Sequence, residues 1–150
     1  MTTIPLPTEF SELLKSLNKH DVRYLVVGGY AVAYHGYPRT TGDIDIWIHR
    51  SAENAYRVVE VLRDFGFDVP ELNVELFLEP KRMVRMGHPP LRVEILTSAS
   101  GVDFEVCYSK RVEDELGGAV ASIIGLDCLR INKRAAGRHK DLSDLENLPE

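Results

Sequence analysis

The sequence predicts one mixed α/β domain, in which helices pack on a small mixed sheet. Short runs of apolar and β-branched residues that end at glycine, such as Tyr24–Val27, are typical of buried strands. Longer stretches between them carry apolar residues three and four positions apart, as amphipathic helices do. The 150 residues, with 44 % hydrophobic and 27 % charged content, fit a single globular domain spanning 1–150.

Turn and capping signals divide the chain into elements. Thr8 and Ser51 are expected to cap the first and third helices, and Gly66 and Gly137 to end helices. The expected helices are the one after Thr8, 30–35, the one after Ser51, 102–108, 126–136 and 140–148. The expected strands are 24–27, 43–48, 74–80, 82–87, 91–96 and 119–125.

The charge distribution favours a compact anionic ligand. The formal net charge of -5 argues against a protein that coats nucleic acid. The segment 130–140 nevertheless holds five cations and no acid: Arg130, Lys133, Arg134, Arg138 and Lys140. Such a local cationic patch on an acidic protein suits a small polyanion better than a long one.

Targeting and cysteine signals point to an intracellular protein. No apolar run approaches the roughly 18 residues of a membrane span, so no membrane partner is expected. The first residues lack the features of a signal peptide, which predicts a cytoplasmic location. Cys107 and Cys128 match no metal or redox spacing, and we expect buried free thiols.

Two aspartates on the strand at 43–48 are the main chemical signal. Side chains alternate along a strand, so Asp43 and Asp45 share a face with Trp47, opposite a face of isoleucines. Adjacent carboxylates repel each other, and a divalent cation offsets this repulsion. The alternative is a solvated edge strand, because short motifs often occur by chance.

The glycine pair upstream makes the aspartate motif more specific. Gly28 and Gly29 end a buried strand and precede a helix, where their backbone N–H groups can approach a phosphate. The alternative is an ordinary strand-to-helix turn. Arg39, just before the aspartates, is expected either to hold a phosphate or the acid pair, or to be a solvated loop residue.

A third carboxylate is expected on the strand at 91–96. Glu94 interrupts an apolar strand and shares a face with Arg92, so it is either a third metal ligand or an exposed partner of Arg92. Asp103 is the competing candidate. It lies near an expected helix N-terminus, where acids are favoured for structural reasons.

Together these motifs resemble the nucleotidyltransferase superfamily that shares its catalytic core with DNA polymerase beta. The segments RTTGDIDIWI, LRVEILTSASGVDFEV and KRAAGRHKDLSDLENL are most similar to small bacterial nucleotidyltransferases grouped with abortive-infection toxins and minimal nucleotidyltransferases. The resemblance extends from about Tyr24 to the C-terminus. It implies a nucleotidyltransferase-like core followed by C-terminal helices.

The resemblance also implies an activity and a set of site residues. The protein would transfer a nucleoside monophosphate from a nucleoside triphosphate to a hydroxyl of RNA, protein or a small molecule, in a toxin–antitoxin or phage-defence setting. Mg²⁺ or Mn²⁺ would be held by the catalytic residues Asp43, Asp45 and Glu94. The triphosphate would contact Gly28, Gly29, Lys133, Arg138 and Lys140.

Two positions depart from the family pattern and keep a second hypothesis open. Tyr30 follows the glycine pair where a serine is frequent, and Glu94 replaces the more usual aspartate. A weakly active or inactive nucleotidyltransferase-fold binding module, such as an antitoxin, is therefore the alternative. A third hypothesis is a plain α/β domain with surface aspartates.

Overall fold

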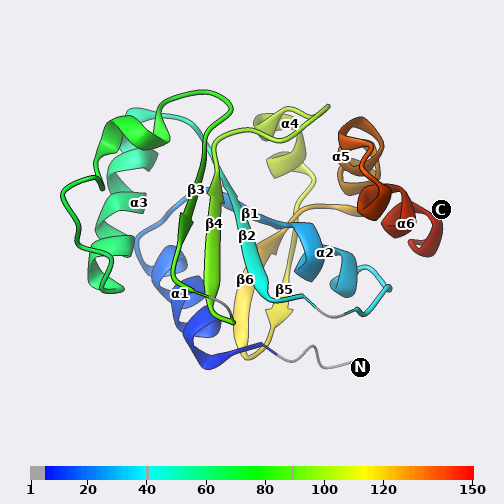
Figure 1. Ribbon diagram of the computed structural model, residues 1–150, viewed down its shortest axis with the longest axis horizontal. Helices are drawn as coiled ribbons and strands as arrows, with labels where there is room; N and C mark the ends of the chain where they lie inside the picture. Colours follow the sequence, from blue (N-terminus) through cyan, green and yellow to red (C-terminus); the bar gives the residue numbers. More distant parts are fainter. Residues whose placement is uncertain (1–5, 40, 89) are drawn as a thin grey trace.

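The computed structural model describes residues 6–39, 41–88 and 90–150, which form a six-stranded mixed sheet flanked by helices (Figure 1). The strand order is β3-β4-β2-β1-β6-β5. The strands are β1 (Tyr24–Val27), β2 (Asp43–Ile48), β3 (Met83–Met86), β4 (Arg92–Leu96), β5 (Val112–Leu116) and β6 (Ala119–Ile123). The predicted fold class, a mixed α/β domain, is confirmed.

Helices cover both faces of this sheet. They are α1 (Thr8–Lys19), α2 (Gly28–Tyr34), α3 (Ala52–Asp64), α4 (Phe104–Ser109), α5 (Leu126–Ala136) and α6 (His139–Asn147), with a 3₁₀ helix, η1 (Val74–Phe77). Figure 1 shows α1 and α3 against one face and α2, α5 and α6 on the other side. In the part of the chain that the structure describes, no helix has the length and apolarity needed to span a membrane.

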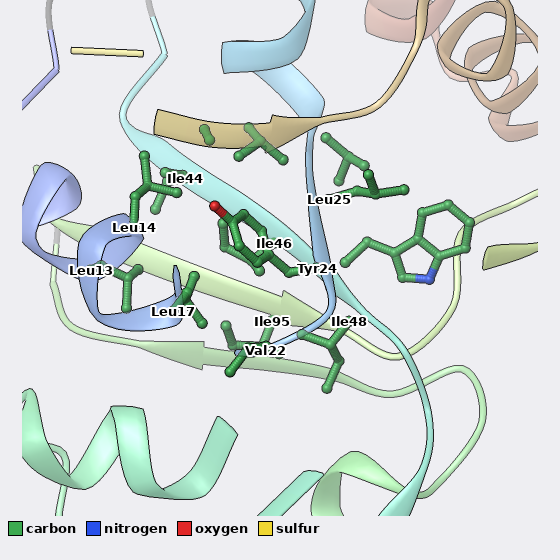
Figure 2. Packing of buried hydrophobic residues seen from close by; sticks show 14 of the residues in the cluster. Leu13, Leu14, Leu17, Val22, Tyr24, Leu25, Ile44, Ile46, Ile48 and Ile95 are labelled. Atoms are coloured by element: carbon green, nitrogen blue, oxygen red, sulfur yellow. The ribbon is translucent and has the colours of Figure 1, made fainter. Parts of the chain in front are cut away.

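The core lies mainly between the isoleucine face of β2 and helix α1. Figure 2 shows α1 side chains and strand isoleucines packed together, namely Leu13, Leu14, Leu17, Ile44, Ile46, Ile48 and Ile95, all of them buried. Removing this apolar surface from water stabilises the layer by roughly 25 cal/mol per Å². On the other face of β2, Trp47 is also buried and meets the Phe104 ring edge-on at 5.2 Å. Trp47 therefore fills space beneath α4.

Several predicted element ends are confirmed by their capping geometry. The Ser51 hydroxyl accepts a hydrogen bond from the Asn54 N–H at the start of α3. Asp103 caps α4 by accepting from the Val106 N–H at 3.1 Å. Gly137 ends α5 in the left-handed conformation. Asp103 thus has the structural role expected of an acid at a helix N-terminus.

The structure corrects four element predictions. Residues 74–80 do not form a strand, because the Asn73 side chain caps Leu76 N–H and starts η1 instead. Thr8 is not the cap of α1, since Pro7 occupies that position without a side-chain bond. Helix α2 begins at Gly28 instead of residue 30. Strand β5, VEDEL, was not predicted because its three consecutive acids break the apolar alternation. It forms a hairpin with β6.

Candidate active site

The parallel pairing of β2 and β4 brings the three predicted acids onto one sheet face. In the register, Asp43 lies opposite Arg92 and Asp45 lies opposite Glu94. Asp43 and Asp45 are two residues apart, so both point to the same side as Glu94. The sheet therefore gathers Asp43, Asp45 and Glu94 into one cluster, together with Arg92.

Two arginines neutralise the outer acids of this cluster. Arg92 Nη2 donates to Asp43 Oδ2 at 3.0 Å. Arg85, opposite Glu94 across the β3–β4 pair, donates from Nε to Glu94 Oε1 at 2.8 Å. The alternative prediction, an exposed Glu94 paired with Arg92, is wrong, because Glu94 is buried and forms its ion pair with Arg85 of the adjacent strand β3.

Asp45 lies between these two acids on the sheet face, and no arginine or lysine of the described residues forms an ion pair with it. Burial, together with the neighbouring Glu94 carboxylate, raises the pKa of Asp45 to about 8, although Lys140 acts in the opposite direction. Its Oδ1 is buried and has no hydrogen-bond partner among the described residues. A buried carboxylate oxygen without a partner costs free energy, so this atom is suited to a cation or a proton.

The glycine pair makes room for the polar groups of the site. Gly28 has φ +66, and a β-carbon there would overlap the Asp45 carboxylate. A β-carbon on Gly29 would come within 2.6 Å of the Thr41 hydroxyl oxygen. Tyr30, in contrast, is buried and packs edge-on against Phe10 with ring centroids 6.1 Å apart. The residue after the glycine pair therefore contributes to the core.

All of the predicted site residues line one cleft of about 830 Å³. The acids lie on its sheet wall, and the cationic tail of α5 and α6 forms the opposite wall. The predicted residues that line it are Gly28, Gly29, Arg39, Asp43, Asp45, Glu94, Lys133, Arg138 and Lys140. Residues separated by more than 100 positions in the sequence thus meet around one cavity.

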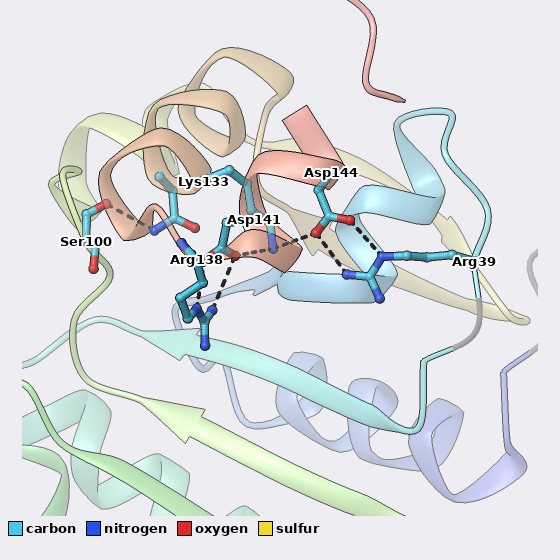
Figure 3. A network of polar contacts seen from close by, with 7 residues as sticks. Arg39, Ser100, Lys133, Arg138, Asp141 and Asp144 are labelled. Carbon is cyan, nitrogen blue, oxygen red and sulfur yellow. Dashed lines mark hydrogen bonds and ion pairs between the residues drawn. The ribbon is translucent and has the colours of Figure 1, made fainter. Parts of the chain in front are cut away.

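The cationic wall is organised by two buried aspartates (Figure 3). Lys133 is only 3 % exposed, and its Nζ lies 3.2 Å from Asp141 Oδ1 and 3.1 Å from Asp144 Oδ2. Arg39 donates two hydrogen bonds to Asp144, from Nε to Oδ1 at 2.8 Å and from Nη2 to Oδ2 at 2.9 Å. Arg138 Nε donates to Asp141 Oδ2 at 2.7 Å.

This network changes what the tail cations offer a ligand. Burial alone would raise the pKa of Asp141 and Asp144, but the cations around them hold both pKa values below the ordinary range. Both carboxylates are therefore ionised and compensate much of the charge of Lys133 and Arg39. Arg138 is 68 % exposed and can reach further into the cleft. Lys140 is exposed and has no ion-pair partner among the described residues.

Sequence reasoning missed Arg85, Asp141 and Asp144 as parts of the site. Arg85 shares a face of β3 with Met83, and this pattern carries no signal without the register of β3 on β4. Asp141 and Asp144 lie one turn apart on α6, so they share a helix face. Two acids at this helical spacing, directly after a segment with five cations, are the signal from which a charge network could have been predicted.

The residue types fit a divalent metal ion, although the ligands are not assembled. Within residues 6–39, 41–88 and 90–150, no three carboxylate, histidine or cysteine groups are arranged to hold a metal. Asp43 and Glu94 turn to Arg92 and Arg85 instead. Three hard oxygen donors, one with an orphaned buried atom, are nevertheless the set that Mg²⁺ and Mn²⁺ prefer.

A mixed sheet with paired strand carboxylates, a glycine turn and a cationic helical tail defines a nucleotidyltransferase-type protein. Comparison with family models assigns residues 9–145 to the aminoglycoside-2''-adenylyltransferase family. The chain belongs to this family and is accordingly a nucleotidyltransferase. A comparison with curated proteins finds no match.

Solved structures share the fold over nearly the whole chain. A protein from Thermotoga maritima assigned as a nucleotidyltransferase has a TM-score of 0.64 at 19 % identity, covering 96 % of this chain and 94 % of its own. The lincosamide antibiotic adenylyltransferase LnuA, bound to lincomycin, has a TM-score of 0.57 at 15 % identity, covering 95 % and 96 %. The antibiotic-resistance factor ANT(2'')-Ia has a TM-score of 0.59 at 11 % identity, covering 93 % and 80 %. At these identities the likeness concerns the fold.

Proposed function

We propose that the protein transfers a nucleoside monophosphate from a nucleoside triphosphate to a hydroxyl group of a small molecule, with Mg²⁺ or Mn²⁺ as cofactor. The observation that carries this proposal is the convergence of three carboxylates, the glycine pair and a cationic wall on one cleft. A cleft of about 830 Å³ lies within the range of roughly 300–1,000 Å³ typical of small-molecule sites.

Asp43, Asp45 and Glu94 are the proposed metal ligands and catalytic residues. A bound divalent cation would stabilise charge on the transferring phosphate and lower the pKa of the acceptor hydroxyl. Asp45 has the orphaned oxygen, and Asp43 and Glu94 would exchange their arginine partners for the cation. The two guanidiniums released by that exchange would then be available to other anions in the cleft.

Four other cleft residues, Gly28, Gly29, Arg138 and Lys140, would bind and orient the triphosphate. Gly28 and Gly29 line the cleft, and their backbone N–H groups would contact the phosphates. Lys140 and Arg138 supply positive charge for the leaving pyrophosphate. In the transfer, the acceptor oxygen bonds to the α-phosphorus, the α–β phosphoanhydride bond breaks, and the hydroxyl proton leaves to solvent.

A small-molecule acceptor is favoured over RNA or a protein. The net charge of -5 and the exposed acids of β5 oppose an extended polyanion. One structural neighbour is named as a lincosamide antibiotic adenylyltransferase and another as an antibiotic-resistance factor, which also supports a small acceptor. A toxin–antitoxin or phage-defence role would require a macromolecular acceptor and is an outcome of the test below.

One observation favours a second candidate function, a catalytically weak binding module. The ion pairs Arg92–Asp43 and Arg85–Glu94 engage two of the three acids. If these pairs persisted in the presence of cation and nucleotide, the acid face would be a structural network. The protein would then bind a ligand or partner without transferring a nucleotide.

The decisive experiment uses labelled nucleoside triphosphates, Mg²⁺ or Mn²⁺, and a cell extract divided by molecular size. We expect label to enter the small-molecule fraction. Glu94→Gln should reduce transfer on the order of a thousandfold, about 4 kcal/mol of transition-state stabilisation. Asp103→Asn preserves the α4 cap and should retain most of the activity.

The other outcomes are equally informative. Label in material that ribonuclease or protease digests would refute the small acceptor. If the protein neither labels any fraction nor gains thermal stability with nucleotide and Mn²⁺, it does not act as a nucleotidyltransferase. The second candidate function, a binding module, would then replace the proposed one. If Asp103→Asn were inactive and Glu94→Gln active, Asp103 and not Glu94 would be the third acid of the site.

A further inference from the structure

We infer that the acceptor is an anionic hydroxyl compound, bearing a carboxylate or phosphate group, and that Arg85 and Arg92 recognise that group. This inference rests on the proposed function and specifies its substrate class. It differs from the acceptor that the family's name suggests, since an aminoglycoside is a polycation that needs several free carboxylates around it.

The charge of the cleft opposes a polycation. Its described lining residues include six cations and four acids, namely Arg39, Arg85, Arg92, Lys133, Arg138, Lys140, Asp43, Asp45, Glu94 and Asp141. Asp141 is already bound by Lys133 and Arg138. The other three acids are the proposed metal ligands. No carboxylate among the described lining residues is therefore left to bind an acceptor's ammonium groups.

Arg85 and Arg92 lie where an acceptor would approach the third acid. Arg85 is directly opposite Glu94, and Arg92 is two residues before Glu94 on the same face of β4. Diagonal neighbours of this kind have Cα atoms roughly 7–8 Å apart. Arginines whose Cα atoms lie this far apart can bring both guanidiniums to one carboxylate or phosphate group.

Both arginines have hydrogen-bonding capacity for a ligand. Arg92 Nε is buried and has no acceptor among the described residues. Arg85 is 57 % exposed on the edge strand, and among the described residues its side chain pairs with Glu94 alone. A cation bound by Asp43 and Glu94 would release both guanidiniums from their present carboxylates. An anionic acceptor would then supply the missing charge.

The adjacent wall suits an uncharged molecular frame. Met83 pairs with Leu96 next to the Arg85–Glu94 pair, and both line the cleft. The wall continues through Ser98, Ala99 and Ser100, which carry no side-chain charge. An acceptor with one anionic group, a hydroxyl and a neutral frame matches this arrangement, in which arginines are followed along the cleft wall by uncharged residues.

The test measures binding of three probes to the full chain with Mg²⁺ and a non-hydrolysable nucleoside triphosphate analogue. The probes are glycerol 3-phosphate, its neutral match glycerol, and the polycation kanamycin. We expect glycerol 3-phosphate to bind most tightly. Arg85→Gln should weaken glycerol 3-phosphate binding at least about tenfold more than it weakens binding of the analogue. Arg82→Gln is the matched control, because Arg82 pairs with Glu79 outside the cleft lining.

A parallel arm uses the metabolite extract itself. Passing the extract over an anion exchanger should remove the acceptor activity, and passing it over a cation exchanger should leave it. Preference for kanamycin, equal binding of glycerol and glycerol 3-phosphate, or acceptor activity removed by the cation exchanger would overturn the inference. So would label in RNA.

The failure of this inference is distinguishable from failure of the proposed function. If Arg85→Gln weakens the triphosphate analogue as much as the probe, Arg85 belongs to the triphosphate site and only the inference fails. If the parent protein does not bind the analogue with Mg²⁺ or Mn²⁺, the proposed function itself fails. Arg92→Gln provides a second variant, judged by the same two affinities.

Discussion

Gly28 lies directly against the Asp45 carboxylate, and the strand register that pairs Val27 with Asp45 holds them together. A β-carbon on Gly28 would overlap an Asp45 oxygen, and the backbone there has φ +66. Glycine is therefore required at this position by the close approach of the Asp45 carboxylate as well as by the positive φ of the turn. Any residue larger than glycine must displace that carboxylate.

Gly28→Ala should destabilise the protein and impair the site. The strained backbone costs about 1–3 kcal/mol, and the overlap adds displacement of Asp45. We expect a lower melting temperature and loss of the stabilisation that nucleotide and Mn²⁺ give the parent. Gly118→Ala is the matched control, since Gly118 has φ +90 but open space around the missing β-carbon. If both variants keep the nucleotide response, the overlap does not affect the site.

Lys133→Ala should act through stability more than through nucleotide contact. It removes the ammonium shared by the buried carboxylates of Asp141 and Asp144, which keep their arginine partners, so the loss should lie below the roughly 3–5 kcal/mol of an uncompensated buried charge. Chemical denaturation measures this loss, and high salt should change it little because the group is buried. Arg134→Ala, an exposed neighbour on α5, is the control. A fully stable Lys133→Ala with weakened nucleotide binding would show direct phosphate contact.

Lys140→Ala should weaken nucleotide affinity several-fold while leaving stability nearly unchanged. Lys140 is exposed, lines the cleft and has no ion-pair partner among the described residues. Its effect should shrink as salt rises, because exposed charges are screened over about 8–10 Å at physiological salt. Calorimetric titration of a triphosphate with Mg²⁺ at low and high salt tests this, with Lys15→Ala on α1 as control. An unchanged affinity would assign Lys140 to the solvated surface.

The pKa of Asp45 predicts how stability depends on pH. The pKa of Asp45 is raised from 3.8 to about 8. Between these two pH values the folded protein therefore keeps a proton on Asp45 that the unfolded chain has lost. The Asp45 contribution therefore makes the free energy of unfolding fall as pH rises through this window. Asp45→Asn should remove that component of the slope in the metal-free protein, as measured by denaturation at several pH values.

The same titration affects metal binding. A divalent cation needs the ionised carboxylate, so Mn²⁺ should raise the melting temperature more at pH 8.5 than at pH 6.5. Asp45→Asn should lose this difference. An equal response at both pH values would mean that Mn²⁺ binds without Asp45.

Local pattern predicted the elements that build the acid face. Alternation along DIDIWI separates Asp43 and Asp45 from the isoleucine face, and both sets lie as predicted. The apolar stripe of α1 predicted its packing on the sheet. These features follow from neighbours a few residues apart, so the sequence alone determines them. The strand prediction for 74–80 failed because a single Asn73 cap outweighs a weak alternation.

Only the tertiary structure decided which charges meet. Arg39 binds Asp144 across 105 positions of sequence, and Arg85 reaches Glu94 through the pairing of β3 with β4. Lys133 looked like a phosphate ligand because 130–140 contains no acid, yet α6 brings two buried aspartates against it. Ion pairing depends on distances of a few ångströms between distant segments. The sequence by itself determined the carboxylates and glycines of the site, and the fold determined which cations remain available to a ligand.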